Sequence, residues 1–450
     1  MRAEHPTVRL FRIPLTSHAR PATLRAMFRG LLMSSALLAL CAIVPHGRAQ
    51  EASRDAAADV ATEAAAPTFG AMRRPEVRVG LHVSGEPSNA VRELRALLEA
   101  DLQLVPAIVV TRPGSGRDAR AYVRPQGDGF AISLEVDGTD ETTPLFVSHR
   151  GNELRALGHA VARDLALALT GERPSFEGRL AFARRDPGRR KQVFVAEWDG
   201  FAPRRVSSEH ASALLPGFVG AVLWWSVLEP HRTFLTHEHA AGGVVMESGG
   251  TDMGIASCND ALVLSSSRSG DAEVWLAQRD GTSLRRLTEH PGIDVSPSCA
   301  GDRLAFVSDR DGTPRVHLGR LGADGALTSS VAITSPGETQ TPSLCQSSRG
   351  LLLAYTRLGG AMRVEMLDVD RGQRRVLSPP GMAAKDPSFS PDCRFVAYVA
   401  RGRGVVVASV DDPTRHRLVI PGAAETVRWG PPARTLPVTS ERASALAAPR

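Results

Sequence analysis

The feature that most constrains this sequence is an apolar triplet that recurs six times after residue 176. The central residues of neighbouring triplets lie 39 to 49 residues apart, and further strand candidates and polar turns follow each triplet. A repeat of this length with several short strands per unit is typical of a propeller blade. Residues 176–432 therefore predict an all-β six-bladed β-propeller. The triplets are Leu180–Phe182, Leu223–Trp225, Leu262–Leu264, Leu304–Phe306, Leu353–Tyr355 and Val396–Tyr398.

An open solenoid is the alternative architecture for such an all-β array. A closed ring is favoured because six units suit a propeller and neither end of the array resembles a capping repeat. The segment Thr426–Trp429 resembles the inner strand of a last blade. We expect it to complete a blade with strands from the other end of the array, which would close the ring. Residues 433–450 are predicted to be a disordered tail.

Residues 76–175 follow a different pattern, which predicts a small α/β domain. Strand candidates there surround two segments of helical periodicity. The first helix is predicted from Ser88 to about Asp101, and the second from Asn152 to about Leu169. Gly171 is expected to end the second helix.

The first 49 residues have the organisation of a secretory signal peptide. The apolar run Leu31–Val44 is shorter than the roughly 20 residues that a membrane-spanning helix needs. Basic residues precede this run, and Gly47 and Ala49 are small residues before a cut after Ala49. A buried helix and a lipoprotein signal are weaker alternatives, and bulky Leu40 before Cys41 disfavours lipidation. Met1 and Met27 are both candidate starts, and the Ala-rich residues 50–75 predict a flexible linker.

Charge and composition narrow the classes of function. The balance of 42% hydrophobic and 23% charged residues excludes a chain that is disordered throughout and a polytopic membrane protein. The net charge of +6 points at first to nucleic acid. Residues 1–49, however, hold seven of the 54 basic residues and one of the 48 acidic residues, so the remainder is neutral. We therefore expect no nucleic-acid partner for the exported protein.

The junction between the two predicted domains resembles the TolB family. In that family a helix that ends in L-T-G-E-R-x-x-F leads directly into the first propeller strand. Here Leu169–Arg173, Phe176 and Arg179–Phe182 occupy the matching places. Ser308–Gly312 also matches the family's S-D-R-x-G turn, and the resemblance covers residues 76–430.

A second repeat motif strengthens this resemblance and also shows a departure. Pro387–Asp392 matches the P-S-F-S-P-D part of the family's P-S-F-S-P-D-G motif, with Cys393 in place of the final glycine. The segments Pro297–Asp302 and Pro342–Cys345 are degenerate copies, and Ala211–Gly250 is barely recognisable as a blade.

The resemblance implies a periplasmic component of the Tol-Pal envelope system. The propeller of that family binds the peptidoglycan-associated lipoprotein Pal at one mouth of its channel, and the segment after the signal peptide binds TolA. The system supports outer-membrane integrity and cell division. We accordingly expect a monomer without a membrane span or cofactor, although the segment from Glu51 shows no obvious TolA-binding pattern.

Two other functions remain open. A TolB-related periplasmic propeller could bind another envelope protein, a peptide or a glycan. A propeller hydrolase is less favoured, because the sequence lacks G-x-S-x-G, H-E-x-x-H and P-loop motifs and no segment beside the propeller is long enough for a hydrolase domain. No catalytic residue is therefore predicted.

Histidines cluster in the degenerate second blade, at His231, His237 and His239 beside Glu238. Such side chains can bind a metal. In an extended strand, however, His237 and His239 share one face while Glu238 points away. Because no second ligand cluster is evident, structural or solvated histidines are favoured and no metal site is predicted.

Four cysteines follow the leader, at Cys258, Cys299, Cys345 and Cys393, with spacings that match the repeat. Equivalent points on neighbouring blades are usually farther apart than the roughly 4.4–6.8 Å between the Cα atoms of a disulfide. The pattern C-x-x-C of a zinc site is also absent. The cysteines are predicted to be small buried apolar residues.

A partner-binding face is predicted from the propeller architecture. The innermost strand of each blade lines the channel, and the loop before it opens on one face. Four of the six residues that precede the predicted inner strands are carboxylates, which predicts an acidic mouth that receives a basic residue or a cation. The six are His210, Asp252, Asp294, Thr341, Asp386 and Glu425.

Overall fold

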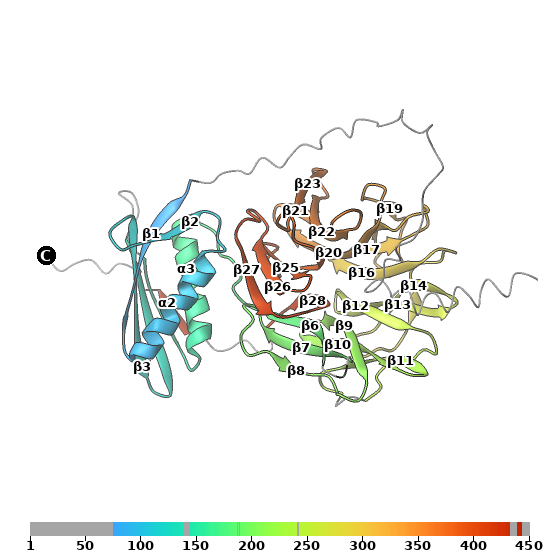
Figure 1. Cartoon of the computed structure of the whole chain (residues 1–450), viewed down its shortest axis with the longest axis horizontal. Coiled ribbons are helices and arrows are strands. Elements are labelled where there is room, and N and C mark those ends of the chain that lie inside the picture. Colours follow the sequence, from blue (N-terminus) through green and yellow to red (C-terminus); the bar gives the residue numbers. More distant parts are fainter. Residues whose placement is uncertain are drawn as a thin grey trace, which may run out of the picture. The chain divides into compact units, whose positions relative to one another are not determined.

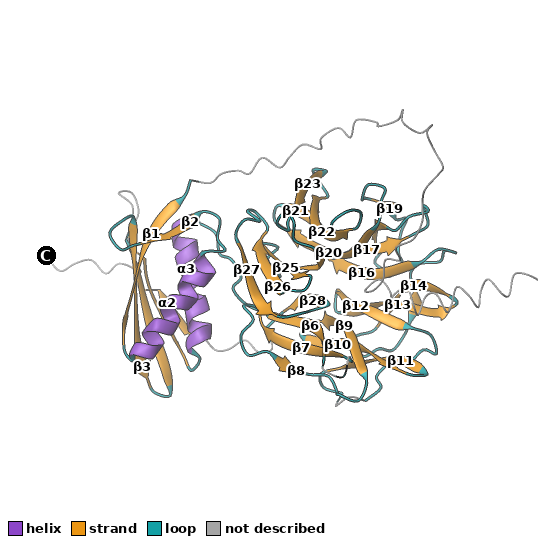
Figure 2. Cartoon of the chain, in the orientation of Figure 1, coloured by secondary structure: helices purple, strands orange, loops and turns teal. Residues whose placement is uncertain are grey.

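The computed structural model describes residues 75–137, 145–186, 188, 190–240, 243–432 and 439–442. The predicted signal peptide and residues 50–74 of the predicted linker lie outside this part of the chain. None of the helices within it is long and apolar enough to span a bilayer. The strands and helices form an α/β domain and a ring of blades (Figures 1 and 2).

The α/β domain is a six-stranded sheet in the order β2-β1-β3-β4-β5-β29. Strand β1 pairs in parallel with β2 and β3, and the other pairs are antiparallel. Helices α2 and α3 pack on the same face of this sheet (Figure 1). The elements are β1 (Val77–Gly85), α2 (Ser88–Leu102), β2 (Ile108–Thr111), β3 (Arg117–Gln126), β4 (Gly129–Val136), β5 (Leu145–Gly151), α3 (Leu154–Thr170) and β29 (Thr439–Arg442).

The two helices fold because each has one apolar face that packs in the core of the domain. Leu94 and Leu98 of α2 and Leu157 and Val161 of α3 are fully buried in one cluster. A Cβ added at Gly158 would meet the side chain of Leu97 at 2.9 Å, so the helices approach closely there. Helix α3 begins two residues later than predicted and ends as predicted at Gly171, whose φ is 74°.

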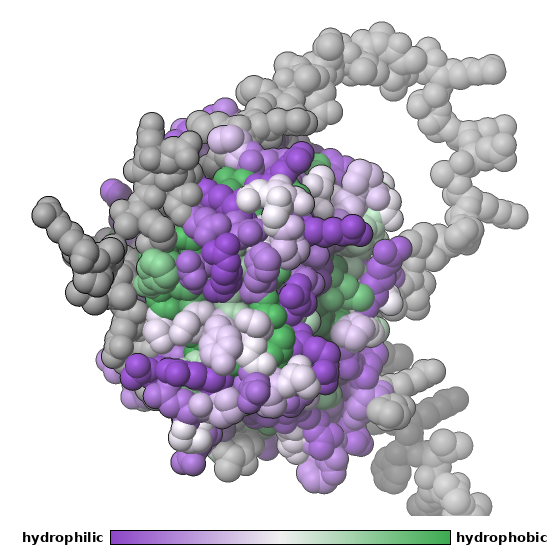
Figure 3. Space-filling view, turned by 90° about the vertical axis from the view of Figure 1, so that its left-hand side faces the viewer, coloured by the Kyte–Doolittle hydropathy of each residue, from purple (hydrophilic) through white to green (hydrophobic). Residues whose placement is uncertain are grey.

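The opposite face of the sheet is mostly polar. Figure 3 views the left-hand side of Figure 1, where β1 and β3 lie, and hydrophilic residues spread over this face with apolar areas only in small patches. Tyr122 and Phe146 are exposed, and Arg120 forms an ion pair with Asp137 at 2.6 Å. This mixture fits a solvated face better than a second core layer.

Of the predicted disordered tail, residues 439–442 form a strand, and residues 433–438 and 443–450 lie outside the described residues. Thr439–Arg442 forms β29, which pairs antiparallel with β5 and places Thr439 opposite Arg150. The free N–H and C=O groups of a sheet edge can pair with a short strand that has no apolar pattern of its own. Periodicity therefore did not reveal this strand.

The remaining described residues form six sheets, as the repeat predicts, and we number them as blades in chain order. Each apolar triplet lies on the second strand of its blade. Blade 1 consists of β28, β6 (Arg179–Arg185), β7 (Lys191–Glu197) and β8 (Arg204–Arg205). Blade 2 consists of β9 (Ser212–Val219), β10 (Val222–Glu229) and β11 (Arg232–His237). Blade 3 consists of β12 (Asp252–Cys258), β13 (Ala261–Ser269), β14 (Asp271–Ala277) and β15 (Arg285–Arg286).

The other three blades have four strands each. Blade 4 consists of β16 (Asp294–Ala300), β17 (Arg303–Ser308), β18 (Arg315–Arg320) and β19 (Val331–Ala332). Blade 5 consists of β20 (Thr339–Ser347), β21 (Gly350–Arg357), β22 (Arg363–Asp368) and β23 (Gln373–Val376). Blade 6 consists of β24 (Ala384–Phe389), β25 (Phe395–Ala400), β26 (Gly404–Ser409) and β27 (His416–Pro421).

Blade 1 closes the ring with strands from the two ends of the propeller sequence. Its inner strand is β28 (Thr426–Gly430), which pairs antiparallel with β6. This pairing confirms the predicted closure and excludes the open solenoid. Blade 2 is the irregular one: its three strands are followed by an isolated bridge between Leu235 and Met246.

The residues of the junction motif attach the connecting segment to the propeller. Glu172 forms an ion pair with Arg394 of blade 6. The ring of Phe176 stacks on Trp198 of blade 1 at 5.5 Å and on Phe395 of blade 6 at 5.6 Å. The motif that carries the family resemblance therefore has a structural role at the seam of the ring.

The cysteine prediction is wrong: the four cysteines form two disulfides. Cys258 pairs with Cys299 and Cys345 with Cys393, with Cα–Cα distances of 5.2 and 5.8 Å. The bonded residues lie on or next to the inner strands of neighbouring blades. Blades converge toward the axis of a propeller, so neighbouring inner strands come much closer than the outer strands do. The repeat spacing alone therefore overestimated the Cα–Cα distance between cysteines on neighbouring inner strands.

Candidate binding site in the propeller channel

A repeated β-bulge shapes the inner strands that surround the channel. In blades 2 to 6 the pairing of the first and second strands shifts register, whereas β28 of blade 1 pairs without a shift. Each bulge holds a residue with φ between 49° and 67°. Proline follows in four of the five, and its missing N–H leaves no donor unpaired where the pairing breaks. The bulge residues are Leu215, Gly254, Ser296, Thr341 and Asp386.

The serine after the bulge links neighbouring blades. In blades 4, 5 and 6 its hydroxyl accepts a hydrogen bond from a backbone N–H on the next inner strand. The donors and acceptors are Leu344 to Ser298 at 2.9 Å, Phe389 to Ser343 at 3.2 Å, and Trp429 to Ser388 at 2.9 Å. The proline-serine step of the repeat motif is thus a connection between blades.

The six predicted mouth residues do not form one ring. Asp252 and Asp294 begin the inner strands of blades 3 and 4 at equivalent positions, and Glu425 directly precedes β28. Thr341 and Asp386 lie deeper, in the bulges of blades 5 and 6. The sixth, His210, lies in an exposed turn before blade 2. Thr341 and Asp386 lie two residues further along their strands than Asp252 and Asp294 do, so the predicted residues occupy different depths.

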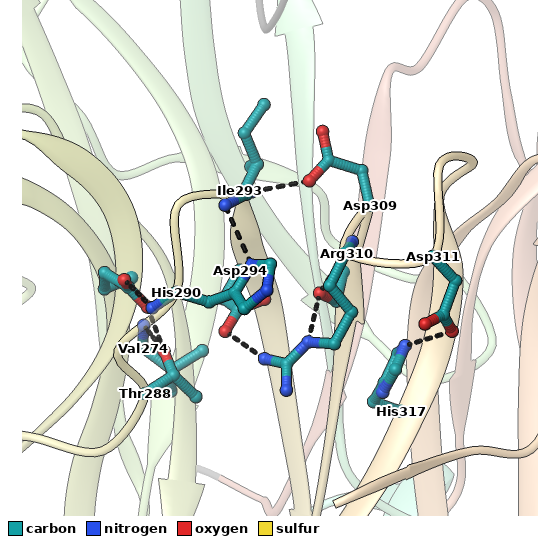
Figure 4. Close-up of polar contacts among 12 residues, drawn as sticks. Val274, Thr288, His290, Ile293, Asp294, Asp309, Arg310, Asp311 and His317 are labelled. Atoms are coloured by element: carbon teal, nitrogen blue, oxygen red, sulfur yellow. Dashed lines mark hydrogen bonds and ion pairs between the residues drawn. The ribbon is translucent and has the colours of Figure 1, made fainter.

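Asp294 is fully buried in an ion pair (Figure 4). Its Oδ2 accepts a hydrogen bond from Arg310 Nη2 at 2.6 Å, and Arg310 Nε donates to Ser308 Oγ at 2.8 Å. Burial raises the pKa of Asp294, and the charge of Glu273 adds to this, while Ser308 and Arg310 oppose it. Arg310, the arginine of the S-D-R-x-G turn, therefore forms an ion pair with Asp294, the first residue of the inner strand.

Blade 3 repeats this arrangement more loosely. Arg268 Nε donates to Ser266 Oγ at 3.3 Å, and Arg268 Nη2 lies 4.0 Å from Asp252 Oδ1. Ser248 Oγ also donates to Asp252 Oδ1, at 2.8 Å. The carboxylate of Asp252 thus relies less on its arginine than Asp294 does.

The other two carboxylates are also matched by cations. Glu425 contacts Arg185 Nε and Lys191 Nζ, each at 2.6 Å. Burial would raise the pKa of Glu425, but Lys191 and Arg185 hold it below its ordinary value. Asp386 pairs with Lys385 at 3.2 Å. The four carboxylates are therefore members of ion pairs rather than an open acidic surface.

A channel residue that the sequence interpretation missed is Arg428. It lies opposite Ala181, the central residue of the first triplet. The residues opposite the central triplet residue in the other blades are all small, namely Gly217, Ala256, Ser298, Ser343 and Ser388. An alignment of the blades by strand register would have revealed this arginine as the exception.

In the histidine-rich segment of blade 2, His237 and Glu238 have structural contacts, whereas His231 and His239 are exposed. Glu238 pairs with Arg179 of blade 1 at 3.1 Å and accepts a hydrogen bond from the N–H of Leu223 at 2.9 Å. The ring of His237 packs edge-on against Trp224. The described part of the chain contains no group of three or more His, Cys, Asp or Glu residues that could hold a metal ion.

The comparison with protein families identifies the fold. Residues 167–433 match the family described as the TolB beta propeller domain. The chain belongs to the TolB family. Among individual proteins, it is 31% identical over 202 residues to a protein TolB homolog of Chlorobium luteolum, which covers 42% of this chain and 46% of that protein.

Two further relatives extend this match. The Tol-Pal system protein TolB of Bordetella pertussis is 26% identical over 300 residues, which is 62% of this chain and 66% of that protein. The chain thus spans about half to two thirds of these TolB relatives. The crystal structure of TolB from Acinetobacter baumannii superposes with a TM-score of 0.68 at 20% identity, over 80% of this chain and 98% of that chain, which shows a shared fold.

Proposed function

We propose that this TolB-family protein is a periplasmic protein-binding scaffold of a Tol-Pal envelope system and supports outer-membrane integrity and cell division. The observation that carries this proposal is the family match across the whole propeller, together with the similarity to a Tol-Pal system protein over 300 residues. Both the α/β domain and the propeller are present in the order that the family resemblance implies.

The two disulfides support an extracytoplasmic location. Disulfides persist in oxidising compartments such as the bacterial periplasm and are rare in the cytosol. Both bonds lie in the propeller, so they indicate this location without reference to the predicted leader.

We place a Pal-like lipoprotein at the channel mouth where the inner strands begin, and we propose a TolA-like protein as a further partner of a monomeric scaffold. Of the six predicted residues, His210, Thr341 and Glu425 have accessible surface, whereas Asp252, Asp294 and Asp386 are buried. The buried carboxylates would shape the mouth through their ion pairs, and the accessible residues would contact the partner.

The proposed role is binding without catalysis or a cofactor. The four predicted mouth carboxylates lie in ion pairs with Arg or Lys, and none of them is assigned as a nucleophile or a general base. A TolB-related module with another envelope partner is the second candidate, because blade 2 departs from the four-stranded pattern of its neighbours.

Affinity capture from solubilised envelopes tests the proposal. We expect the full-length tagged protein to recover a Pal-like lipoprotein, and a deletion strain to leak periplasmic proteins. A tagged, exported protein of unrelated fold is the control. Recovery of a different envelope protein together with an intact outer membrane in the deletion strain would reject the Tol-Pal role and favour the second candidate.

A further inference from the structure

We propose that Arg428 is a receptor in the propeller channel for a carboxylate of the bound partner protein. This inference rests on the proposed function, since it assigns the chemistry of the group that enters the same channel. It reverses the expectation of a basic or cationic ligand.

The internal symmetry of the propeller shows that an arginine is not needed at this position for folding. Five blades place glycine, alanine or serine opposite the central residue of the triplet. In three of them the residue is a serine that accepts a hydrogen bond from the next blade. An arginine has no acceptor atom on its side chain, so Arg428 cannot make this connection to blade 2.

The guanidinium of Arg428 has unused hydrogen-bonding capacity. Its one hydrogen bond among the described residues is from Nη1 to the carbonyl oxygen of Val427, at 2.7 Å. No carboxylate of the described residues lies within ion-pair distance of it. Because Arg428 keeps some accessible surface on the inner strand, its remaining N–H groups can reach a molecule in the channel.

The surroundings do not neutralise this charge. Burial lowers the pKa of the Arg428 guanidinium, and Asp386 is the acid that opposes this effect. Asp386, however, already pairs with Lys385 at 3.2 Å. A desolvated cation without a paired counter-charge is costly to a protein, so such a group is a candidate for ligand binding.

The planar guanidinium fork favours a carboxylate as the ligand. It can donate two parallel hydrogen bonds to the two oxygens of an aspartate or glutamate side chain or of a C-terminus. At a half-buried position such as that of Arg428, such a pair is stronger and more selective than the same pair at an exposed surface. We therefore infer that an acidic residue of the partner enters the channel and contacts Arg428.

The test compares Arg428→Ser with Arg204→Ser. The first variant installs the residue that blades 4 to 6 carry at this position, so we expect it to fold. The second removes the same charge from β8, the outermost strand of the same blade, where Arg204 is exposed. Purified variants are titrated with the lipoprotein recovered by affinity capture. We expect Arg428→Ser to weaken binding about 30-fold or more, Arg428→Lys to weaken it less, and Arg204→Ser to leave it unchanged.

A second measurement does not depend on the identity of the partner. Sodium acetate is titrated into the full-length protein at constant ionic strength, with chloride as the reference, and the arginine side-chain NMR signals are followed. We expect a saturable shift of one guanidinium signal that is absent from Arg428→Ser. If no partner is captured but this shift appears, the proposed function fails and the anion site stands. If Arg428→Ser binds the captured lipoprotein as tightly as the wild type does, the assignment to a partner carboxylate is overturned.

Discussion

Blades 4 and 1 differ in the origin of their inner strands and in the role of the arginine near each of them. Blade 4 consists of consecutive strands, has a bulge at Ser296, and pairs Asp294 with Arg310 from the turn that follows its own second strand. Blade 1 takes its inner strand from the other end of the propeller, lacks the bulge and presents Arg428 to the channel. In the regular blade an arginine pairs with the carboxylate of the inner strand, whereas Arg428 of the closing blade has no described carboxylate within ion-pair distance. In the blade that lacks the repeated bulge and serine, the side chain of Arg428 is available for the proposed binding.

The largest effect on stability is expected at the closing strand. Trp429 is buried in β28 and stacks on Trp198 at 6.0 Å, and its indole N–H donates to the carbonyl oxygen of Glu177. Trp429→Ala should lower the free energy of unfolding by about 3–5 kcal/mol, because a large buried cavity remains. Chemical denaturation monitored by circular dichroism measures this loss. Trp275→Ala in blade 3 is the control, and an equal loss there would remove the special role of the closing strand.

The disulfides should have the next largest effect. Replacement of Cys258 and Cys299 by serine should cost about 3 kcal/mol of stability, since the bond closes a long loop in the unfolded chain. The matched pair is Cys345 and Cys393. Its blades are connected by two hydrogen bonds from the inner strand of blade 6, to Thr356 and Ser343, whereas among the described residues the inner strand of blade 4 donates one to blade 3, from Ser296 to Ser265. We expect the first double variant to melt at a lower temperature than the second. The opposite order in thermal melting would show that the serine contact adds little.

Removal of the arginine from the ion pairs of blades 4 and 3 should lower the stability by a smaller amount, and by different amounts in the two blades. Arg310→Ala leaves the buried carboxylate of Asp294 without its cation and should cost about 2 kcal/mol at pH 7. Arg268→Ala should cost less, because Asp252 keeps its hydrogen bond from Ser248. Equal losses in urea denaturation would contradict this difference between the blades.

The cost of Arg310→Ala should also depend on pH. The folded-state pKa of Asp294 is raised above its unfolded value, so the folded protein binds the proton more readily than the unfolded chain. As the pH falls through the folded pKa, Asp294 becomes neutral and no longer needs Arg310. The stability difference between the wild type and Arg310→Ala should therefore shrink on acidification. A difference that grows with acid would show that Asp294 is not the group involved.

The smallest effect on stability is expected at Arg428. Arg428→Ser removes a partly buried charge and restores the serine of the regular blades, so the free energy of unfolding should change by less than about 1 kcal/mol or should rise. Thermal melting of this variant beside Arg204→Ser measures the change. A loss as large as that of Trp429→Ala would show that Arg428 is a structural residue of blade 1.

Local pattern was sufficient to predict the architecture. The apolar triplets, the helical periodicity and Gly171 predicted the second strands, the two helices and the end of α3, because each depends on which nearby residues can be buried together. The closing segment was recognised as an inner strand by its resemblance to the other repeats.

The composition of the site was much less predictable. The sequence placed Asp294 and Asp252 near the channel but did not show that Arg310 and Arg268 neutralise them. Arg268 lies on the neighbouring strand of the same sheet, and Arg310 lies in the turn that follows the neighbouring strand. Carboxylates that look like an open surface in the sequence are buried pairs in the fold.

The sequence alone therefore specified the α/β domain, the six blades and the exchange of strands that closes the ring, since these follow from repeated short-range patterns of burial. Only the tertiary structure decided which cysteines join, which charges cancel and that no described carboxylate lies within ion-pair distance of Arg428. These properties depend on distances between inner strands that converge on the axis from blades some 40 to 50 residues apart in the chain.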